Sequence, residues 1–417
     1  MTDVKEPVKD WKTDYDIFDP DYVKNPFPVW DEIRSDGKCP VAHSERYMGS
    51  WMPTRYKDLF NIARDVEHFS SREVLVVPIM PPEGTEWDEN QEFNGVAAPP
   101  ITSDPPEHTW ARALLLQPFS MKSIERWEPV TREHCRKLID KFIAEGRADA
   151  AVDYAQQIPP YVIARMLGIP TEMTDTFTQW VREFLEYGLQ NFELASNSRM
   201  QILTFLWAQI QERRANPQEG DLISHLIQSE ISEGVPVPDP HILGTAFLLL
   251  LAGIDTTWSS IGSAMWHLAQ HPEHRKRLIE EPGLITNAVE ELLRAYSPVT
   301  MARIVASDIE YNGCPMKENE RIVMNFPAAN RDPEKFENPH EVILDRPANP
   351  HIAFGVGIHR CAGSNLARME MRVAIQEWLA RIPDFKLEDP DAVTWAGGQV
   401  RGPRTLPVVF PAGGSGK

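Results

Sequence analysis

Residues 354–363 read Phe-Gly-Val-Gly-Ile-His-Arg-Cys-Ala-Gly, and an amphipathic, helix-like stretch follows them. The glycines allow a tight turn and a close approach of the backbone. A cysteine just before a helix has its thiolate stabilised by the free N–H groups of the helix N-terminus. His359 and Arg360 add positive charge beside Cys361. The pattern therefore indicates that Cys361 is a metal ligand or a reactive thiolate.

The remaining cysteines do not form a recognisable motif with Cys361. The chain has four cysteines, Cys39, Cys135, Cys314 and Cys361, which are too few and too scattered for a disulfide framework. No Cys-x-x-Cys pair occurs, so structural zinc, plant-type iron–sulfur ligation and covalent c-type haem attachment lack their usual signature. We expect Cys39, Cys135 and Cys314 to be inert core thiols.

The composition is typical of a soluble globular protein. Of the 417 residues, 42% are hydrophobic and 25% are charged, and the net charge is −19. This acidic balance argues against a nucleic-acid partner or an anionic membrane surface. The N-terminus lacks the apolar core of a signal peptide. The longest apolar run, Thr245–Ile254, is about half of the ~20 residues that a membrane span requires, so we expect a cytoplasmic protein without a membrane anchor.

Helical periodicity dominates from Pro105 to about Arg294, and strand-like segments cluster after Ser297. Helices are expected over 28–34, 128–145, 154–167, 171–190, 197–215, 238–270, 283–296 and 363–381, with strands over 47–56, 302–311, 321–326 and 403–410. The fold class is therefore mainly α with small β-sheets (α+β). We expect a polar surface segment over 1–20, a single domain over 21–412 and a flexible tail over 413–417. The Pro- and Gly-rich stretch 73–104 is expected to be a binding loop or lid.

The expected helix 238–270 is apolar on all sides, which is typical of a buried central helix. Its middle nevertheless contains Gly253, Asp255, Thr256 and Thr257, which are poor residues in a helix interior. A buried carboxylate is costly unless it is hydrogen-bonded. Two interpretations stay open: Asp255 caps the second of two shorter helices, or the polar residues form a notch that holds water and a proton relay at an internal pocket.

Glu291 and Arg294 are three residues apart, so one helix face carries both side chains and an ion pair forms easily. Most such pairs lie on the surface and contribute little to stability. Taken alone, this motif favours an ordinary surface pair.

Taken together, these segments resemble the cytochrome P-450 family. Residues 252–257 are similar to the oxygen-activation motif in the family's long central helix, which lies over the haem. Glu291 and Arg294 are similar to its buried ion pair, for which Arg346 would supply a second arginine. The fixed positions of the family's haem-binding loop are matched by Phe354, Gly357, His359, Cys361 and Gly363.

The resemblance implies that the protein is a haem-thiolate monooxygenase whose cofactor is haem b. It implies that Cys361 is the iron ligand, in a loop that also contains Phe354, Gly355 and Gly363. Cations are needed at the haem carboxylates, and the resemblance assigns this role to His108, Arg112, Arg303 and His359. It assigns proton delivery to Asp255 and Thr256.

The reaction would insert one oxygen atom of O2 into a substrate. The chain after Cys361 is too short for a fused reductase domain, so we expect a separate ferredoxin (2Fe-2S) or flavodoxin as electron donor and a monomeric enzyme. An acidic donor requires local positive charge on the thiolate side, for which the candidates are Arg112, Lys122, Arg126, Arg360, Arg368 and Arg372.

The substrate pocket implied by the resemblance is apolar. Its expected members are Val77, Phe93, Val96, Ala97, Phe184, Leu248, Ala252, Val299, Met301 and Val400. None of these side chains is charged, which favours a small or medium lipophilic substrate such as a terpenoid, alkyl or aromatic compound. Two alternatives stay open: a redox-neutral or peroxide-driven haem-thiolate enzyme, and a non-enzymatic haem sensor. The Asp255–Thr256 pair favours the monooxygenase, because neither alternative requires it.

Overall fold

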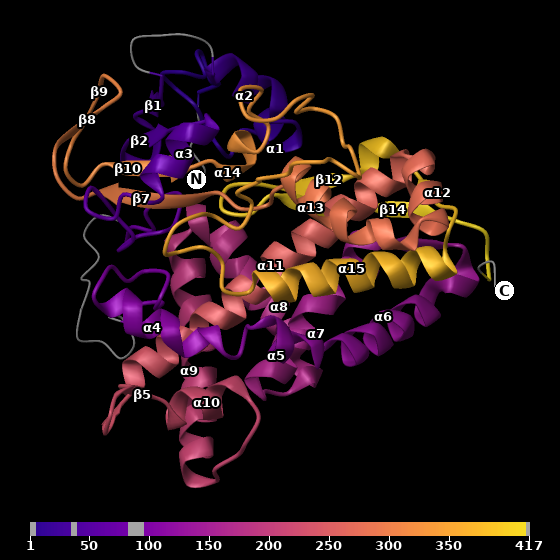
Figure 1. Cartoon of the computed structure of the whole chain (residues 1–417), viewed down its shortest axis with the longest axis horizontal. Coiled ribbons are helices and arrows are strands. Elements are labelled where there is room, and N and C mark those ends of the chain that lie inside the picture. Colours follow the sequence, from indigo (N-terminus) through magenta and orange to yellow (C-terminus); the bar gives the residue numbers. More distant parts are fainter. Residues whose placement is uncertain (1–5, 35–39, 82–95, 414–417) are drawn as a thin grey trace.

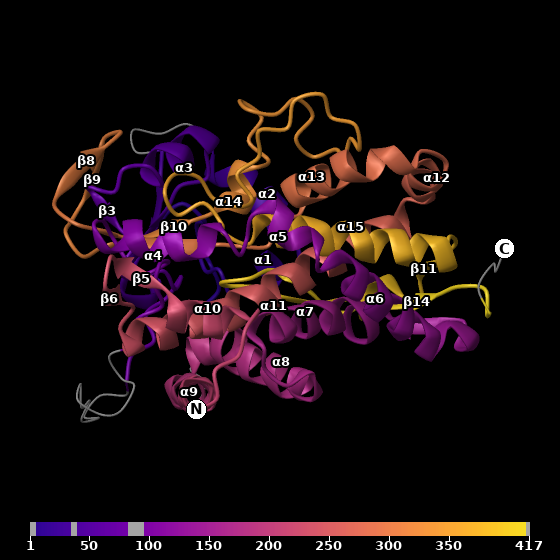
Figure 2. The ribbon, with the colours of Figure 1, turned by 60° about the horizontal axis from the view of Figure 1, so that its bottom comes forward.

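The computed structural model describes residues 6–34, 40–81 and 96–413. Figures 1 and 2 show a body of helices gathered around α11, with the largest sheet and α3 at one end. The helices are α1 (Pro20–Lys24), α2 (Phe27–Ile33), α3 (Tyr56–Ile62), α4 (Glu107–Leu116), α5 (Met121–Glu125), α6 (Glu128–Phe142), α7 (Ile158–Leu167), α8 (Thr174–Arg182), α9 (Phe192–Ala215), α10 (Leu222–Gln228), α11 (Asp239–Gln270), α12 (Pro272–Glu280), α13 (Ile285–Ala295), α14 (Phe326–Ala329) and α15 (Ser364–Arg381).

The strands are short, and the predicted class, mainly α with small sheets, is confirmed. The largest sheet has the order β1-β2-β10-β7-β3, in which only β2 and β10 pair in parallel. The strands are β1 (Ala42–Ser44), β2 (Ser50–Met52), β3 (Phe69–Ser70), β4 (Arg147–Asp149), β5 (Glu230–Ser232), β6 (Val235–Pro236), β7 (Met301–Val305), β8 (Ile309–Tyr311), β9 (Cys314–Met316), β10 (Arg321–Met324), β11 (Lys386–Leu387), β12 (Thr394–Ala396), β13 (Gly402–Thr405) and β14 (Pro407–Val409).

The central helix is continuous. α11 has 32 residues and is about 48 Å long at 1.5 Å per residue. It is long and apolar enough to cross a membrane, but 78% of its most apolar window is buried inside the fold, as in the core helix of a soluble protein. Thr256 Oγ1 donates a hydrogen bond to the carbonyl of Ala252 at 2.8 Å, so this hydroxyl is satisfied without breaking the helix. The interpretation of Asp255 as a cap between two helices is therefore wrong.

Several predicted boundaries shift because of local signals. α9 begins five residues earlier than expected, because the side chain of Asn191 caps its first turn. The expected helix 171–190 is interrupted by a π-helical turn over Glu183–Tyr187. The strand or hairpin predicted at 47–56 begins earlier: β2 lies within this range, and its partner β1 lies upstream of it. The expected strand 302–311 divides into β7 and β8, because the chain bends over residues 306–308. Asn312 and Gly313 have positive φ and turn β8 back onto β9.

The described part of the N-terminal segment is not confined to the surface, contrary to expectation. Tyr15 is 3% exposed and Ile17 is 4% exposed, and Tyr15 Oη shares a 2.5 Å hydrogen bond with Ser50 Oγ on β2. Trp11 and Phe18 pack against the same hydrophobic cluster, so four apolar side chains anchor this segment. Packed residues of the fold therefore precede residue 21.

The strand β13 packs directly against α11. A Cβ atom on Gly402 would lie 2.4 Å from Cβ of Ser259, and one on Gly262 would lie 2.8 Å from Cγ of Pro403. Two glycines thus allow the helix and the strand to approach closely. This approach brings Arg404, on β13, next to Asp255 of α11.

Candidate active site

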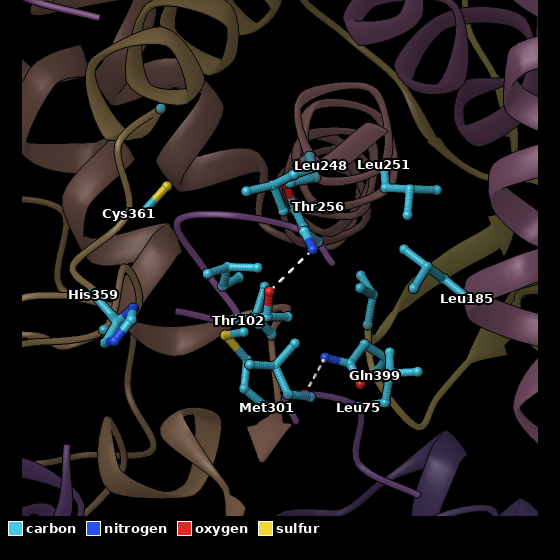
Figure 3. A pocket seen from close by; sticks show the side chains of 18 of the residues that line it. Leu75, Thr102, Leu185, Leu248, Leu251, Thr256, Met301, His359, Cys361 and Gln399 are labelled. Atoms are coloured by element: carbon cyan, nitrogen blue, oxygen red, sulfur yellow. Dashed lines mark hydrogen bonds between the residues drawn. The ribbon is translucent and has the colours of Figure 1, made fainter. Parts of the chain in front are cut away.

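A cavity of about 590 Å³ lies between α11, the loop before α15 and the chain segments 72–80 and 96–102. Cys361 and His359 reach it from the loop, and Thr256 and Leu248 reach it from α11 (Figure 3). Leu185 closes another side. Residues far apart in the sequence therefore share one internal space.

Backbone contacts shape the loop that carries Cys361. The N–H of Cys361 donates to the carbonyl of Phe354 at 2.8 Å. Gly357 has a φ of +80°, and a Cβ there would lie 2.9 Å from the carbonyl oxygen of Ala63, so a side chain is excluded. A Cβ on Gly363 would lie 3.9 Å from the sulfur of Cys361. The loop thus presents an uncrowded sulfur to the cavity.

Opposing effects act on the thiol of Cys361. Burial raises its pKa, whereas the N–H of Gly363 and the positive charges of Arg112, Arg360 and Arg368 lower it. Arg368 also stacks on the ring of Phe354, with its Cζ 4.4 Å from the ring centroid. The net effect is a raised pKa, so the sulfur stays protonated in these surroundings until a bound metal cation holds the thiolate.

Two histidines meet beside this loop. The rings of His108 and His359 have centroids 4.3 Å apart, and His359 Nε2 shares a 2.8 Å hydrogen bond with Ser71 Oγ. Burial lowers the pKa of His359 to about 3, and the nearby charge of Arg303 adds to this effect. Nε2 of His108, which is 4% exposed, has no hydrogen-bond partner among the described residues. Because buried polar atoms are almost always hydrogen-bonded, an unpaired buried nitrogen indicates that a bound group supplies its hydrogen-bond partner.

Two arginines line the same side of the cavity. Arg303 is 5% exposed, and its Nη1 donates to the carbonyl of Ala302. Burial lowers the pKa of Arg303 to about 10. Arg112 donates to the carbonyl of Arg360 at 2.5 Å. No carboxylate of a described residue lies within ion-pair distance of Arg112 or Arg303. These cations and the orphaned nitrogen of His108 fit a cofactor with carboxylate groups, such as haem.

Thr256 and Asp255 lie on different faces of α11. Successive residues of a helix are about 100° apart around its axis. Thr256 lines the cavity, as do Ala252 and Thr257, whereas Asp255 is 1% exposed and does not line it. The structure therefore places only Thr256 of the predicted catalytic pair at the cavity wall.

Asp255 belongs to a buried charge network that the sequence analysis missed. Arg404 Nη2 lies 2.8 Å from its carboxylate, Ser259 donates to it at 3.2 Å, and Arg404 Nε donates to Glu186 at 2.9 Å. Arg182 also pairs with Glu186 at 3.1 Å. Burial raises the pKa of Asp255, and Arg404 opposes this rise. The network links α11 to β13 and to the π-helical turn that carries Phe184 and Leu185.

Every described member of the predicted substrate pocket lines the cavity, and Phe93 lies outside the described residues. These lining residues are Val77, Val96, Ala97, Phe184, Leu248, Ala252, Val299, Met301 and Val400. Residues not predicted include Thr102, Leu185, Phe247 and Leu251.

Polar residues of the wall were also missed, among them Gln399 and Arg199. Gln399 accepts from the N–H of Val76 at 2.9 Å and donates to the carbonyl of Val74 at 3.2 Å, so it fastens the segment 72–80. Arg199 of α9 donates to the carbonyl of Val96 at 2.8 Å, and burial lowers its pKa. The expected list contains no charge, but the cavity wall contains this guanidinium and also Arg72, Glu73 and Arg321. Helical periodicity predicts that Arg199 lies in a helix, but it does not indicate that the side chain points into the cavity.

The predicted ion pair is buried, so the surface interpretation is wrong. Glu291 and Arg294 have side chains that are 0% exposed, and their atoms approach to 2.8 Å. Arg346 joins at 2.9 Å, as predicted. The N–H of Ile343 and the amide of Asn349 donate to the same carboxylate at 2.9 and 3.1 Å. Burial alone would raise the pKa of Glu291, but the hydrogen bonds from Arg294, Arg346 and the N–H of Ile343 lower it below its usual value.

The candidate docking cations divide into two groups. Arg368 pairs with Glu290 and Arg372 pairs with Glu128, each at 2.5 Å, and Arg112 faces the cavity. Lys122, Arg126 and Arg360 are exposed. Exposed apolar side chains occur in the same segments: Leu116, Met121 and Ile358 are 61%, 69% and 40% exposed.

The other cysteines differ in state. Cys135 is a free, buried thiol, as expected, and burial raises its pKa to about 12. Cys314 is disulfide-bonded, so the prediction that it is an inert thiol is wrong. Cysteines that are far apart in the sequence can still form a disulfide when the fold brings their segments together. Cys39 lies outside the described residues.

The fold and the cavity define a haem-thiolate protein: a cysteine faces the interior beneath a long helix, beside a cluster of unpaired cations. The cytochrome P-450 family model matches residues 161–393. The chain is 31% identical over 401 residues to the polyketide biosynthesis cytochrome P-450 PksS of Bacillus subtilis (strain 168), covering 93% of this chain and 96% of that protein. It is 32% identical over 383 residues to the vitamin D(3) 25-hydroxylase of Pseudonocardia autotrophica, covering 89% and 90%.

The solved structure of Bacillus subtilis PksS matches the fold with a TM-score of 0.85 and 32% identity, covering 95% of this chain and 99% of that one. The chain therefore belongs to the cytochrome P-450 family. Its members are oxidoreductases that bind haem b through a thiolate, and they incorporate oxygen into their substrates.

Proposed function

We propose that the protein inserts one oxygen atom of O2 into a small or medium lipophilic substrate, such as a terpenoid, alkyl or aromatic compound. The observation that supports this most is the single cavity shared by Cys361 and Thr256, with mainly apolar side chains around it. The relatives named above include a vitamin D(3) hydroxylase, whose substrate class is also lipophilic. Arg199 adds one donor that suits a substrate with an acceptor oxygen.

Bound haem supplies the redox chemistry, in which O2, two electrons and two protons yield one water and one oxygen atom for the substrate. Cys361 would hold the iron through Sγ. His108, Arg112, Arg303 and His359 would hold the carboxylates. The reaction also requires proton delivery in a cavity with mainly apolar walls, and we propose that Thr256 serves this purpose. Its hydroxyl donates to the carbonyl of Ala252, so its lone pairs are free to accept a hydrogen bond from a water in the cavity.

Thr256→Ala tests this proposal. The variant keeps the apolar walls, so binding of a lipophilic ligand, followed by the shift of the haem spectrum, should change little. Product formed per NADH should fall about tenfold or more because a positioned proton-transfer group is lost, and hydrogen peroxide should replace the product. Substrate binding, NADH consumption, product and peroxide are measured together. Thr245→Ala, a buried α11 threonine away from the cavity, is the control. An unchanged ratio of product to NADH would exclude a role of Thr256 in proton delivery, whereas product formed without NADH consumption would support the redox-neutral alternative.

Asp255 is proposed as the proton source behind Thr256, held ready by Arg404. Asp255→Asn should slow turnover about tenfold, because an amide is a poor proton shuttle. Glu186→Gln is the matched control, since Glu186 binds the same arginine from another element. If both variants slow turnover equally, the network only positions α11 and Asp255 has no role in proton transfer.

We propose a ferredoxin or flavodoxin as the electron donor, docking on the exposed cations Lys122, Arg126 and Arg360. Lys122→Glu combined with Arg126→Glu should raise the KM for a surrogate ferredoxin about three- to tenfold and weaken its salt dependence, because rim charges steer association. Steady-state rates over a range of ionic strength measure this. Lys386→Glu, an exposed lysine of β11, is the control. If Lys386→Glu raises the KM as much as the combined Lys122→Glu and Arg126→Glu change does, the proposed docking surface is excluded.

We also propose that the enzyme is a cytoplasmic monomer with a single catalytic domain. The acidic net charge of −19 and the burial of the one membrane-length helix among the described residues support a soluble protein. Gel filtration of the haem-loaded enzyme tests the monomer.

A further inference from the structure

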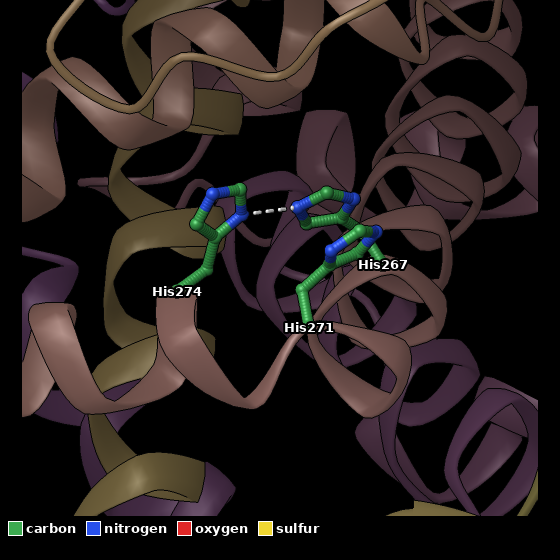
Figure 4. Close-up of side chains that lie close together, drawn as sticks. All are labelled: His267, His271 and His274. Atoms are coloured by element: carbon green, nitrogen blue, oxygen red, sulfur yellow. Dashed lines mark hydrogen bonds between the residues drawn. The ribbon is translucent and has the colours of Figure 1, made fainter.

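Three histidines meet where α11 ends and α12 begins (Figure 4). One ring nitrogen of each of His267, His271 and His274 lies within 4.8 Å of one from both others. The ring centroids are 4.2 Å apart for His267 and His271, and 5.1 and 5.2 Å apart for the pairs that include His274. The cluster lies 11 residues along α11 from Thr256, or about 16 Å, so it does not belong to the active site.

Hydrogen bonds orient these rings. His267 Nδ1 shares a 2.9 Å bond with Tyr296 Oη, and His271 Nδ1 donates to Glu273 Oε1 at 2.8 Å. His267 Nε2 shares a 2.8 Å bond with His274 Nδ1. Ligating histidines commonly have one nitrogen held by an oxygen partner while the other nitrogen binds the metal. Tyr296 and Glu273 occupy that position for two of the three rings.

We propose that His267, His271 and His274 form a binding site for a divalent transition-metal ion, with zinc as the representative. Imidazole nitrogens suit zinc, copper and nickel, and three protein ligands leave a position for water. The side chain of His271 is 42% exposed, so an ion can enter from solvent. Ligands of a tetrahedral zinc ion at 2.0–2.1 Å lie about 3.3 Å apart, so the contact between His267 and His274 would open by about half an ångström.

The charges around the cluster act in opposite directions. Arg331, whose Cζ is 5.6 Å from the ring centroid of Tyr296, adds unfavourable positive charge. Glu273 provides opposing negative charge at the exposed side.

A bound ion would join the C-terminus of α11 to the first turn of α12 and, through Tyr296, to the end of α13. An ion that binds only the folded chain stabilises it by RT ln(1 + c/Kd), where c is the concentration of free ion, so the stabilisation grows with that concentration. The cluster lies away from the cavity, so the ion would act on thermal stability and leave turnover unchanged.

Zinc titration of the haem-loaded full chain tests the site, because haem occupies Cys361. After removal of metals with a chelator, calorimetry should show one zinc per chain, and zinc should raise the unfolding temperature. His271→Ala and His274→Ala should each weaken zinc affinity at least tenfold and abolish the rise in unfolding temperature. Glu273→Gln should weaken affinity about tenfold, as expected for a partner behind a ligand.

His340→Ala, a half-exposed histidine outside the cluster, is the control and should bind zinc like the wild type. The haem spectrum of each variant verifies folding, and His271→Ala, at the most exposed ligand, is the decisive variant if His274→Ala loads haem poorly. Zinc affinity that is equal in wild type and His271→Ala, or no uptake at micromolar zinc, would overturn the proposal.

Discussion

Replacing Cys361 with alanine is expected to abolish the thiolate-type spectrum of the reduced carbon monoxide complex and to reduce turnover to background. The thiolate pushes electron density onto the iron, which favours cleavage of the O–O bond, and no other described cysteine lines the cavity. The absorption spectrum of the reduced complex and product formation with a surrogate donor measure the two effects.

Cys135→Ala is the matched control for this experiment. Cys135 is the other free cysteine of the described chain, but it lies in the core away from the cavity, and its raised pKa keeps it protonated. We expect the control to keep the thiolate spectrum. A thiolate spectrum that survives in Cys361→Ala would refute the assignment of the iron ligand.

Replacing Glu291 with alanine is expected to lower the free energy of unfolding by about 3–5 kcal/mol, because removing one partner of a buried ion pair leaves uncompensated charge. Here two guanidiniums lose their carboxylate: the side chains of Arg294 and Arg346 are 0% and 6% exposed. The N–H of Ile343 loses its acceptor as well. The yield of soluble haem-loaded protein and the urea midpoint should both fall.

Glu280→Ala is the control for this variant, since Glu280 and Lys276 form an exposed pair at 3.8 Å, which should contribute little. A pH series adds a second check. The folded state lowers the pKa of Glu291, so its contribution to stability is present above the unfolded value and is lost as the pH falls through the folded value. Wild type should therefore lose stability in acid more steeply than Glu291→Gln. A well-folded Glu291→Ala enzyme with an unchanged midpoint would contradict the prediction.

The features that follow from local patterns could be predicted from the sequence. The apolar helical pattern over 238–270 predicted both ends of α11 to within one residue. The glycines and cations around Cys361 indicated its chemistry, because they are its near neighbours along the chain. The spacing of Glu291 and Arg294 predicted their pairing, although their burial depended on Arg346 and Ile343 from a distant segment.

The features that depend on long-range packing could not be predicted. The carboxylate of Asp255 turns toward Arg404, 149 residues away, and no periodicity in α11 identifies that partner. Arg199 lies on a helix whose pattern gives no preferred face. Tyr15, Ile17 and Phe18 are flanked by aspartates in a segment that is polar overall, and only the surface against which they pack determines their burial.

Gly402 of β13 packs directly against Ser259 of α11. The distance between this strand and this helix therefore determines whether Asp255 and Arg404 can form their ion pair, in addition to their opposite charges. A methyl group at Gly402 would collide with Ser259 at 2.4 Å, so a Gly402→Ala chain would have to move β13 outward while every charged group stayed in the sequence. A salt bridge lengthens with such a displacement, and its energy falls with distance. The ion pair between Asp255 and Arg404 thus depends on the lack of side chains at Gly402 and Gly262, because only glycine allows α11 and β13 to pack this closely.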